Sequence, residues 1–188
     1  MADDRPLRAD ARRNRDRLLQ TAATAFAADG LSVPLDEIAR RAGVGPGTLY
    51  RHFPTKEALF EAVVHERLGR LLRDARGLGD AADPQAALFG FIERLVSAAA
   101  AKQDLVDALA GANIDVTGTV AATAGELRGE IGHLLARAQD ARGIRDDITL
   151  ADLMALLSGL LSALRARDRA DAGRMLSVLC DGLLPRTA

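Results

Sequence analysis

The 188-residue chain has few of the residues that mark several common protein classes. It contains no Trp, one Tyr and one Cys, and aromatic residues make up only 3% of it. The single Cys180 excludes an intrachain disulfide. No apolar run approaches the roughly 20 residues that cross a bilayer, and the stretch MADDRPLRADARRNRDRLL lacks the apolar segment of a secretory signal. We therefore expect a cytoplasmic protein without a membrane partner.

Patterns typical of catalysis and metal binding are also missing. The three histidines, His52, His65 and His133, are scattered, and Cys180 has no partner at metal-ligand spacing. The chain contains no phosphate loop, nucleophile elbow or dinucleotide fingerprint. We therefore expect no enzyme activity, no metal and no cofactor.

What the sequence has in abundance favours helices. Apolar residues make up 48% of the chain and charged residues 27%, a balance typical of globular proteins. Ala, Leu and Arg are frequent while β-branched and aromatic residues are few, which favours helix over strand. No segment carries a strand pattern, so we predict an all-α fold.

Charge is unevenly distributed along the chain. The net charge is −1, but residues 1–56 hold ten Lys or Arg against seven Asp or Glu, a net charge of +3. The rest of the chain is correspondingly acidic. A basic face that meets phosphate explains this distribution, and so does a solvated Arg-rich helix. Charge alone leaves both interpretations open.

Apolar spacing predicts four helices in the first third of the chain. An amphipathic helix covers about residues 11–28, and a short one covers 35–42, LDEIARRA. Gly43 ends the second helix, and Pro46 begins a third because its missing N–H has no partner in a first turn. Thr55 caps a long helix that runs to about residue 76 and bridges two predicted domains, 1–56 and 57–188.

Two short helices around a tight Gly turn predict a helix-turn-helix domain. Leu49 and Phe53, four residues apart, face inward, while the polar side chains between them face outward. The hydroxyls of Thr48 and Tyr50 can donate hydrogen bonds to phosphate. Arg51 and His52 can reach phosphate or base edges in a major groove. The predicted DNA-binding residues are Gly47, Thr48, Tyr50, Arg51, His52 and Lys56.

The stretch LLQTAATAFAADGLSVPLDEIARRAGVGPGTLYRHFPTKEALFEAV closely resembles the N-terminal domain of the TetR family of bacterial transcriptional repressors. The likeness covers about residues 12–65. It implies a homodimer that binds a palindromic DNA operator and releases it when a small-molecule effector enters the C-terminal helical domain. In the family, the positions of Thr48, Tyr50, His52 and Lys56 commonly contact DNA. The rival interpretation is a helical small-molecule-binding protein with a degenerate DNA-binding head.

One position departs from the family pattern. The second helix usually begins with Ser or Thr, whose hydroxyl caps the helix and can touch phosphate. Here Pro34 takes that place, and Ser32 lies upstream. Loss of the hydroxyl costs about 1 kcal/mol of capping.

The C-terminal two thirds are predicted to form helices at about 84–101, 119–142, 149–166 and 169–184. In LADLMALLSGLLSAL both helix faces are apolar, so this helix lies either in the core of its own chain or in a dimer interface. The family resemblance implies that the last two helices form the dimer's four-helix bundle. The predicted interface residues are Ala155, Gly159, Ala163, Leu176 and Leu179.

No sequence motif in the C-terminal part of the chain identifies the effector. Gly111, Gly118, Gly125 and Gly132 recur every seven residues, which indicates either a glycine stripe or unwound segment beside a cavity, or chance. The scarcity of aromatic residues favours an aliphatic or polar ligand. The predicted ligand-binding residues are Phe89, Phe91, Asn113, Asp115, Thr117 and Thr119.

Overall fold

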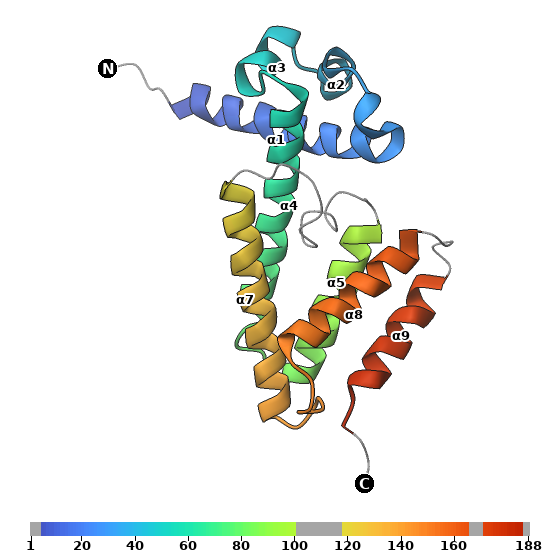
Figure 1. The fold of residues 1–188 in the computed structure, drawn as a ribbon. Coiled ribbons are helices and arrows are strands. Elements are labelled where there is room, and N and C mark those ends of the chain that lie inside the picture. The colour runs from blue at the N-terminus through green and yellow to red at the C-terminus, as the bar shows by residue number, and fades with distance from the viewer. Residues whose placement is uncertain (1–4, 101–117, 166–170, 186–188) are drawn as a thin grey trace. The chain divides into compact units, whose positions relative to one another are not determined.

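The computed structural model describes residues 5–100, 118–165 and 171–185, and these ranges contain helices and loops but no strand (Figure 1). The predicted all-α fold is confirmed. None of the helices in these ranges is long and apolar enough to cross a membrane. The helices are α1 (Arg5–Asp29), the short 3-10 helix η1 (Gly30–Ser32), α2 (Leu35–Ala42), α3 (Pro46–His52), α4 (Lys56–Leu78), α5 (Pro84–Ala100), α7 (Gly118–Asp140), α8 (Leu150–Arg165) and α9 (Ala172–Leu183).

The chain divides into two compact units, residues 1–66 and 67–188, and the division falls inside α4. The part of α4 up to Glu66 belongs to the N-terminal unit, where the buried Phe60 packs against Phe26 of α1. The sequence-based domains, 1–56 and 57–188, follow expected function rather than contacts, and they stay a prediction.

The N-terminal unit is held together by the apolar faces of its helices. α2 packs against both α1 and α3. Leu18 and Ala22 of α1 and Ile38 of α2 are fully buried. The ring of Phe26 on α1 meets the ring of Phe60 on α4 edge-on, with 5.8 Å between their centroids. This core leaves the outer faces of α1 and α3 to solvent.

Helix α1 begins at Arg5, before the predicted start near residue 11. Pro6 falls in the first turn, where a helix needs no N–H from it. Arg and Ala, which fill most of residues 8–13, are strong helix formers. The apolar periodicity begins only at Leu18, so the helix predicted from hydrophobic spacing is too short.

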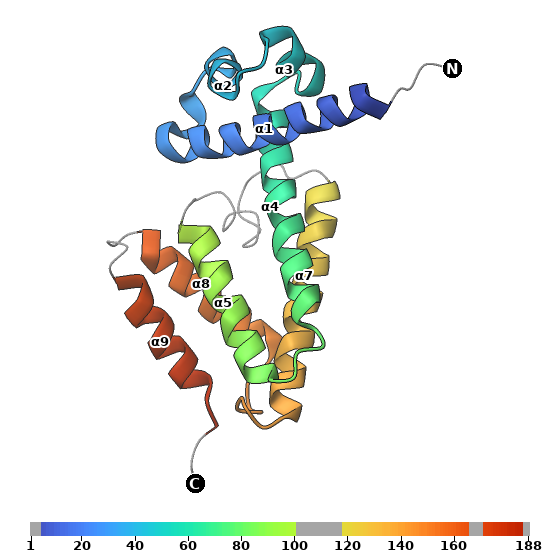
Figure 2. The ribbon, with the colours of Figure 1, turned by 180° about the vertical axis from the view of Figure 1, so that it is seen from behind.

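In the C-terminal unit α5 lies among α7, α8 and α9 and contacts all three (Figures 1 and 2). Leu88, Phe91 and Ile92 of α5 are fully buried. Leu127 and Ile131 of α7 are also fully buried. The unit is therefore a helical bundle with α5 in its core.

The glycines of α7 lie in a regular helix. Gly118, Gly125 and Gly132 are all helical, so an unwound segment is wrong for this part of the chain. At Gly132 a Cβ would stand 3.0 Å from a methyl carbon of Leu150, so this glycine allows the start of α8 to approach α7 closely. Gly111 lies outside the described residues.

Candidate nucleic-acid interface

The turn between α2 and α3 is built on Gly43. Its φ of 66° lies in the left-handed region, which glycine adopts without a steric penalty. The N–H of Gly43 donates to the carbonyl of Arg40, and the N–H of Val44 donates to the carbonyl of Ala39, both at 3.1 Å. These bonds satisfy carbonyls that the end of α2 leaves without helical partners. The turn thus sets the direction in which the chain enters α3.

Helix α3 begins where the sequence predicts. Gly45 is its N-cap residue and Pro46 its first helical residue. The amides of Thr48 and Leu49 donate to the carbonyl of Gly45 at 2.9 and 3.2 Å. Pro46 therefore starts this helix from the first turn, where its missing N–H has no cost.

The two faces of α3 differ sharply. Leu49 is fully buried, and Phe53, which follows the helix, is 2% exposed, so both anchor α3 to the core. Tyr50 is 45% exposed, an unusual state for a large aromatic side chain. The structure therefore brings five of the predicted DNA-binding residues together on one helix. Gly47, Tyr50 and Arg51 are exposed, and Thr48 and His52 are half-buried.

The sixth predicted residue, Lys56, is the first residue of α4 and is half-buried. Thr55 caps the same helix, because its hydroxyl oxygen accepts a hydrogen bond from the N–H of Ala58 at 3.1 Å. The predicted cap is confirmed. Only three residues separate Lys56 from His52, so Lys56 follows closely on the end of α3.

No sequence signal reveals the partner of Tyr50. Its hydroxyl donates a hydrogen bond to the carboxylate of Asp36, in the first turn of α2. The negative charge of Asp36, followed by reduced hydration and the hydrogen bond, raises the pKa of Tyr50. Tyr50 therefore stays a neutral hydrogen-bond donor. These residues are 14 positions apart, so only the packing of α2 on α3 brings them together.

An ion-pair network braces α2. Glu37 accepts hydrogen bonds from Arg40, at 2.8 and 2.7 Å, and from Arg41, at 2.7 Å. The bonds from Arg40 and then Arg41 lower the pKa of Glu37 to about 2. Arg41 also pairs with Asp29 at 2.7 Å, which joins α2 to the end of α1. Two of the exposed arginines near the turn therefore have carboxylate partners in their own chain.

Helix α1 also touches the end of α3. The guanidinium carbon of Arg15 stands 5.0 Å from the ring centroid of Phe53, a cation–π geometry. Sequence spacing does not reveal this contact either.

The start of α2 has the predicted defect. Pro34 occupies the N-cap position and no side chain caps the helix. The hydroxyl of Ser32 instead donates to the carbonyl of Asp29 at 2.9 Å. The acidic residues Asp36 and Glu37 remain in the first turn, where the helix dipole favours them.

Two family models match the chain. Residues 18–63 match the model for bacterial regulatory proteins of the tetR family. Residues 83–185 match the model for the C-terminal domain of SbtR-like transcriptional regulators, and this match alone covers more than half of the chain. This chain belongs to the TetR family. It is a DNA-binding transcriptional regulator rather than an enzyme.

Individual relatives agree with this TetR-family assignment. A TetR transcription regulatory protein from Mycobacterium vanbaalenii is 46% identical, with 95% of this chain and 99% of that one covered and a TM-score of 0.75. The TetR regulator SCO0520 from Streptomyces coelicolor is 36% identical, with 92% of this chain and 99% of that one covered and a TM-score of 0.74. The HTH-type transcriptional repressor KstR2 of Mycolicibacterium smegmatis is 45% identical over 69 residues, 36% of this chain. The match spans only about a third of that repressor's length.

The predicted dimer residues of this TetR-family protein lie on α8 and α9. α8 buries Leu153 and Leu157 in its own unit but leaves Ala155 and Gly159 exposed. Because they are exposed, these two residues are not part of the core of the protomer. Leu156, beside them, is 48% exposed. The remaining predicted interface residues, Ala163, Leu176 and Leu179, are half-buried.

The predicted effector residues fall into three groups. Phe91 is fully buried and Phe89 half-buried on α5, while Thr119 is exposed at the start of α7. Asn113, Asp115 and Thr117 lie outside the described residues. The structure therefore places half of the predicted set, and the effector site stays a prediction.

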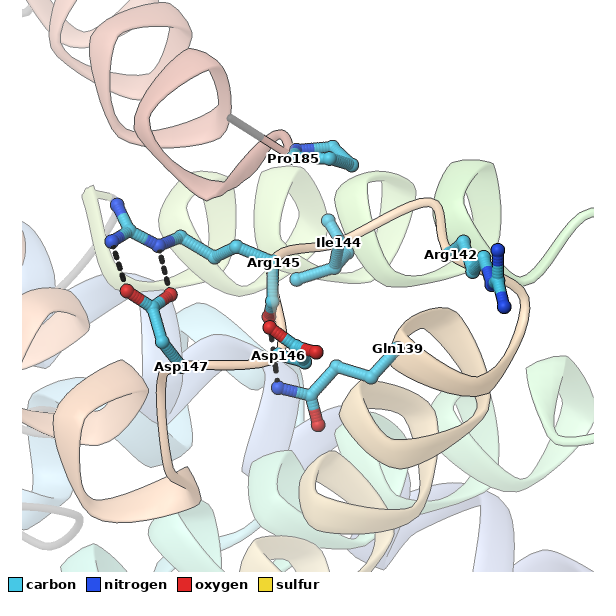
Figure 3. A pocket seen from close by; sticks show the side chains of 7 residues that line it. All are labelled: Gln139, Arg142, Ile144, Arg145, Asp146, Asp147 and Pro185. Atoms are coloured by element: carbon cyan, nitrogen blue, oxygen red, sulfur yellow. Dashed lines mark hydrogen bonds and ion pairs between the residues drawn. The ribbon is translucent and has the colours of Figure 1, made fainter. Parts of the chain in front are cut away.

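A pocket of about 500 Å³ lies elsewhere, between the loop that joins α7 to α8 and the residues after α9 (Figure 3). Arg145 makes a bidentate ion pair with Asp147, and the amide of Gln139 donates to the carbonyl of Arg145 at 3.0 Å. None of the predicted ligand residues that the structure describes lines this pocket. Its lining residues are Gln139, Arg142, Ile144, Arg145, Asp146, Asp147 and Pro185.

Proposed function

We propose that this protein is a homodimeric, ligand-responsive repressor whose helix α3 reads a palindromic DNA operator. One observation carries the proposal: α3 is anchored by the buried Leu49 and Phe53 and turns Tyr50 and Arg51 to solvent. A helix held this way can enter a major groove without disturbing the core. Arg51 can grip O6 and N7 of one guanine together.

Dimerisation follows from the length of DNA that α3 can read. A single short recognition helix reads few base pairs, and a two-fold pair reads two half-sites of a palindrome. The exposed face of α8 supports this step, since the small Ala155 and Gly159 and the exposed apolar side chain of Leu156 lie on it. Val178 on α9 is 67% exposed and adds to the apolar surface of the last two helices.

The effector is proposed to bind in residues 67–188. Helix α5 contributes Phe89 and Phe91, and the segment 103–123 supplies polar contacts. The chain has five Phe and one Tyr, and few of them lie after residue 80, so an aliphatic or polar molecule suits this unit better than a flat aromatic one.

The test is selection of DNA from a fragmented genomic pool by the purified full chain, followed by sequencing of the bound fragments. We expect enrichment of fragments that share an inverted repeat. The double variant Arg51→Ala with Lys56→Ala should lose that enrichment, while circular dichroism shows that the chain is still folded. A wild-type chain that enriches no sequence would overturn the proposal in favour of a helical binding protein with a degenerate head.

A further inference from the structure

The pocket between the α7–α8 loop and the residues after α9 has no part in the proposed function. It is here called the loop pocket, and its lining differs from the residues predicted to bind the effector. Its volume of about 500 Å³ falls in the range of about 300–1,000 Å³ that is typical of small-molecule sites. The C-terminal unit therefore offers room for a second small molecule.

Hydrogen bonds hold the walls of the loop pocket in place. The side-chain amide of Gln139 donates to the carbonyls of Arg145 and Ile148, both at 3.0 Å. The backbone N–H of Arg145 donates to the carbonyl of Leu183 at 3.0 Å, and its guanidinium donates to the carbonyl of Gly182 at 3.3 Å. These bonds tie the loop both to α7 and to the end of α9, so the pocket is formed before any ligand enters it.

Arg142 lines the loop pocket from a backbone conformation that arginine rarely adopts. Its φ of 57° lies in the left-handed region, and no other non-glycine residue that the structure describes has a positive φ. The N–H of Arg142 donates to the carbonyl of Gln139 at 2.8 Å. The next N–H, of Gly143, donates to the carbonyl of Ala138 at 2.9 Å, which completes a Schellman motif at the end of α7.

Glycine is the usual residue at the left-handed position of this motif, because a Cβ there crowds the backbone. The chain has Arg142 instead. Folding alone therefore favours glycine at position 142, and the arginine side chain is kept at a conformational cost. Such strained positions cluster at ligand-binding sites, where the side chain has a role besides folding.

Two opposite charges in the loop pocket have no protein partner in the described part of the chain. The guanidinium of Arg145 is already neutralised by its bidentate pair with Asp147. Arg142 and Asp146 make no hydrogen bond or ion pair with any residue that the structure describes. Figure 3 shows Arg142 on the far side of the pocket from the Arg145–Asp147 pair, with Asp146 nearer the middle. The pocket thus presents one cation and one anion at separate places.

We propose that the loop pocket binds a small aliphatic zwitterion of the amino-acid type. The carboxylate of the ligand pairs with the guanidinium of Arg142, a geometry suited to bidentate hydrogen bonds, and its ammonium group pairs with Asp146. The aliphatic body lies against Ile144 and Pro185, which complete the lining. A ligand with a single charge would be repelled by one of the two protein charges, and this repulsion selects for a zwitterion.

The test is calorimetric titration of the full chain with valine, leucine, isoleucine and methionine at millimolar concentration. We expect at least one of the four to bind. The best ligand is then compared with its two singly charged analogues, which for leucine are isocaproate and isoamylamine. Each analogue should bind about tenfold more weakly, the effect of one lost hydrogen-bonded charge. No binding by any of the four amino acids, or equally tight binding of either analogue, would overturn the inference.

Arg142→Gly separates a role in ligand binding from a role in folding. Its midpoint of urea unfolding should equal or exceed that of the wild type, because glycine suits the left-handed position, while its affinity for the amino acid should fall about tenfold. A lower midpoint or an unchanged affinity would overturn the inference. Arg128→Gln removes an exposed arginine of α7 outside the pocket and should bind the amino acid like the wild type.

Asp146→Asn tests the other end of the ligand. It should weaken binding of the amino acid about tenfold but should not weaken binding of the carboxylate-only analogue, which lacks the ammonium group. Equal losses for both ligands would show that Asp146 only shapes the loop, and would overturn the assignment of a zwitterion. None of these titrations contains DNA, so their outcome is independent of whether the chain selects an operator.

Discussion

The hydroxyl of Tyr50 on α3 donates a hydrogen bond to the carboxylate of Asp36 on α2. In the free protein, the Tyr50 hydroxyl, which is proposed to donate to a DNA phosphate, is therefore held beside the negative charge of Asp36. If Tyr50 donates to phosphate as proposed, DNA binding exchanges this carboxylate for a phosphate, and the charge of Asp36 then lies close to another anion. Asp36 thus opposes DNA binding by repulsion unless its hydrogen bond is needed to orient Tyr50.

Asp36→Asn separates these two effects. The amide oxygen can still accept the hydrogen bond, while the negative charge is gone. We expect a few-fold tighter binding to operator and scrambled DNA alike at about 0.1 M salt, the size of one screened surface charge at close range. Tyr50→Phe should weaken both. Asp74→Asn, at an exposed aspartate of α4, is the control. Weaker binding by Asp36→Asn would mean that the carboxylate is required to hold Tyr50.

Glu37 should make the folded state sensitive to acid. Its pKa is about 2 in the folded chain, below its ordinary value of 4.5, so pairing with Arg40 and Arg41 stabilises the fold above pH 4.5. That stabilisation disappears as pH falls from about 4.5 to about 2. Urea unfolding of Glu37→Gln should show a smaller drop in midpoint across this window than the wild type. Glu57→Gln also removes a first-turn glutamate, and its midpoint should fall as steeply as that of the wild type if the arginines are responsible.

The loop after α7 requires a glycine at position 143, because Gln85 of α5 lies close to its backbone. A Cβ at this position would stand 2.8 Å from Cβ of Gln85, closer than side chains allow. We expect Gly143→Ala to destabilise the chain by about 1–3 kcal/mol, the range for overpacking. A Cβ at Gly125 in α7 meets nothing within 4 Å, so Gly125→Ala should stabilise by up to about 1 kcal/mol through helix propensity. Equal unfolding free energies for the two variants would show that the loop shifts freely.

Local signals explain which parts of the fold can be predicted. The sequence predicts α2 at 35–42 because acidic residues mark its start and Gly43 its end. It does not predict the start of α1, because arginines rather than apolar residues continue the periodicity before Leu18. The polar residues of α3 can be recognised because their types stand out beside Leu49 and Phe53.

Contacts between helices cannot be predicted in the same way. Arg15 meets Phe53, and Asp36 meets Tyr50, only after α1, α2 and α3 have packed. Spacing along one helix says which residues share a face, but it does not say what that face meets. The tight fit of Gly143 is hidden for the same reason, since the sequence shows only a loop glycine.

Gly159 tests the proposed dimer. It is exposed on α8, and a Cβ there meets nothing within 4 Å of its own chain, so Gly159→Glu should leave the protomer folded. A charge buried without a partner in an apolar interface is strongly unfavourable. We expect the variant to sediment as a monomer at micromolar concentration. Gly129→Glu, on an exposed part of α7, should sediment like the wild type. An unchanged dimer for Gly159→Glu would place the interface elsewhere.

Truncation of Arg51 and truncation of Lys56 should change DNA binding in different ways. Arg51 is exposed on α3 and can bind two acceptors of one guanine, so Arg51→Ala should cost about 1–3 kcal/mol per half-site and relax the preference at one base position. Lys56→Ala should weaken operator and scrambled DNA about equally and flatten the salt dependence by about one unit per bound subunit. Both variants keep Leu49 and Phe53, so circular dichroism should show an unchanged fold. Titration of each variant against both DNAs at several salt concentrations makes the comparison. If Arg51→Ala weakened binding to both DNAs equally, Arg51 would hold phosphate only, and sequence would be read through DNA shape or by another side chain of α3.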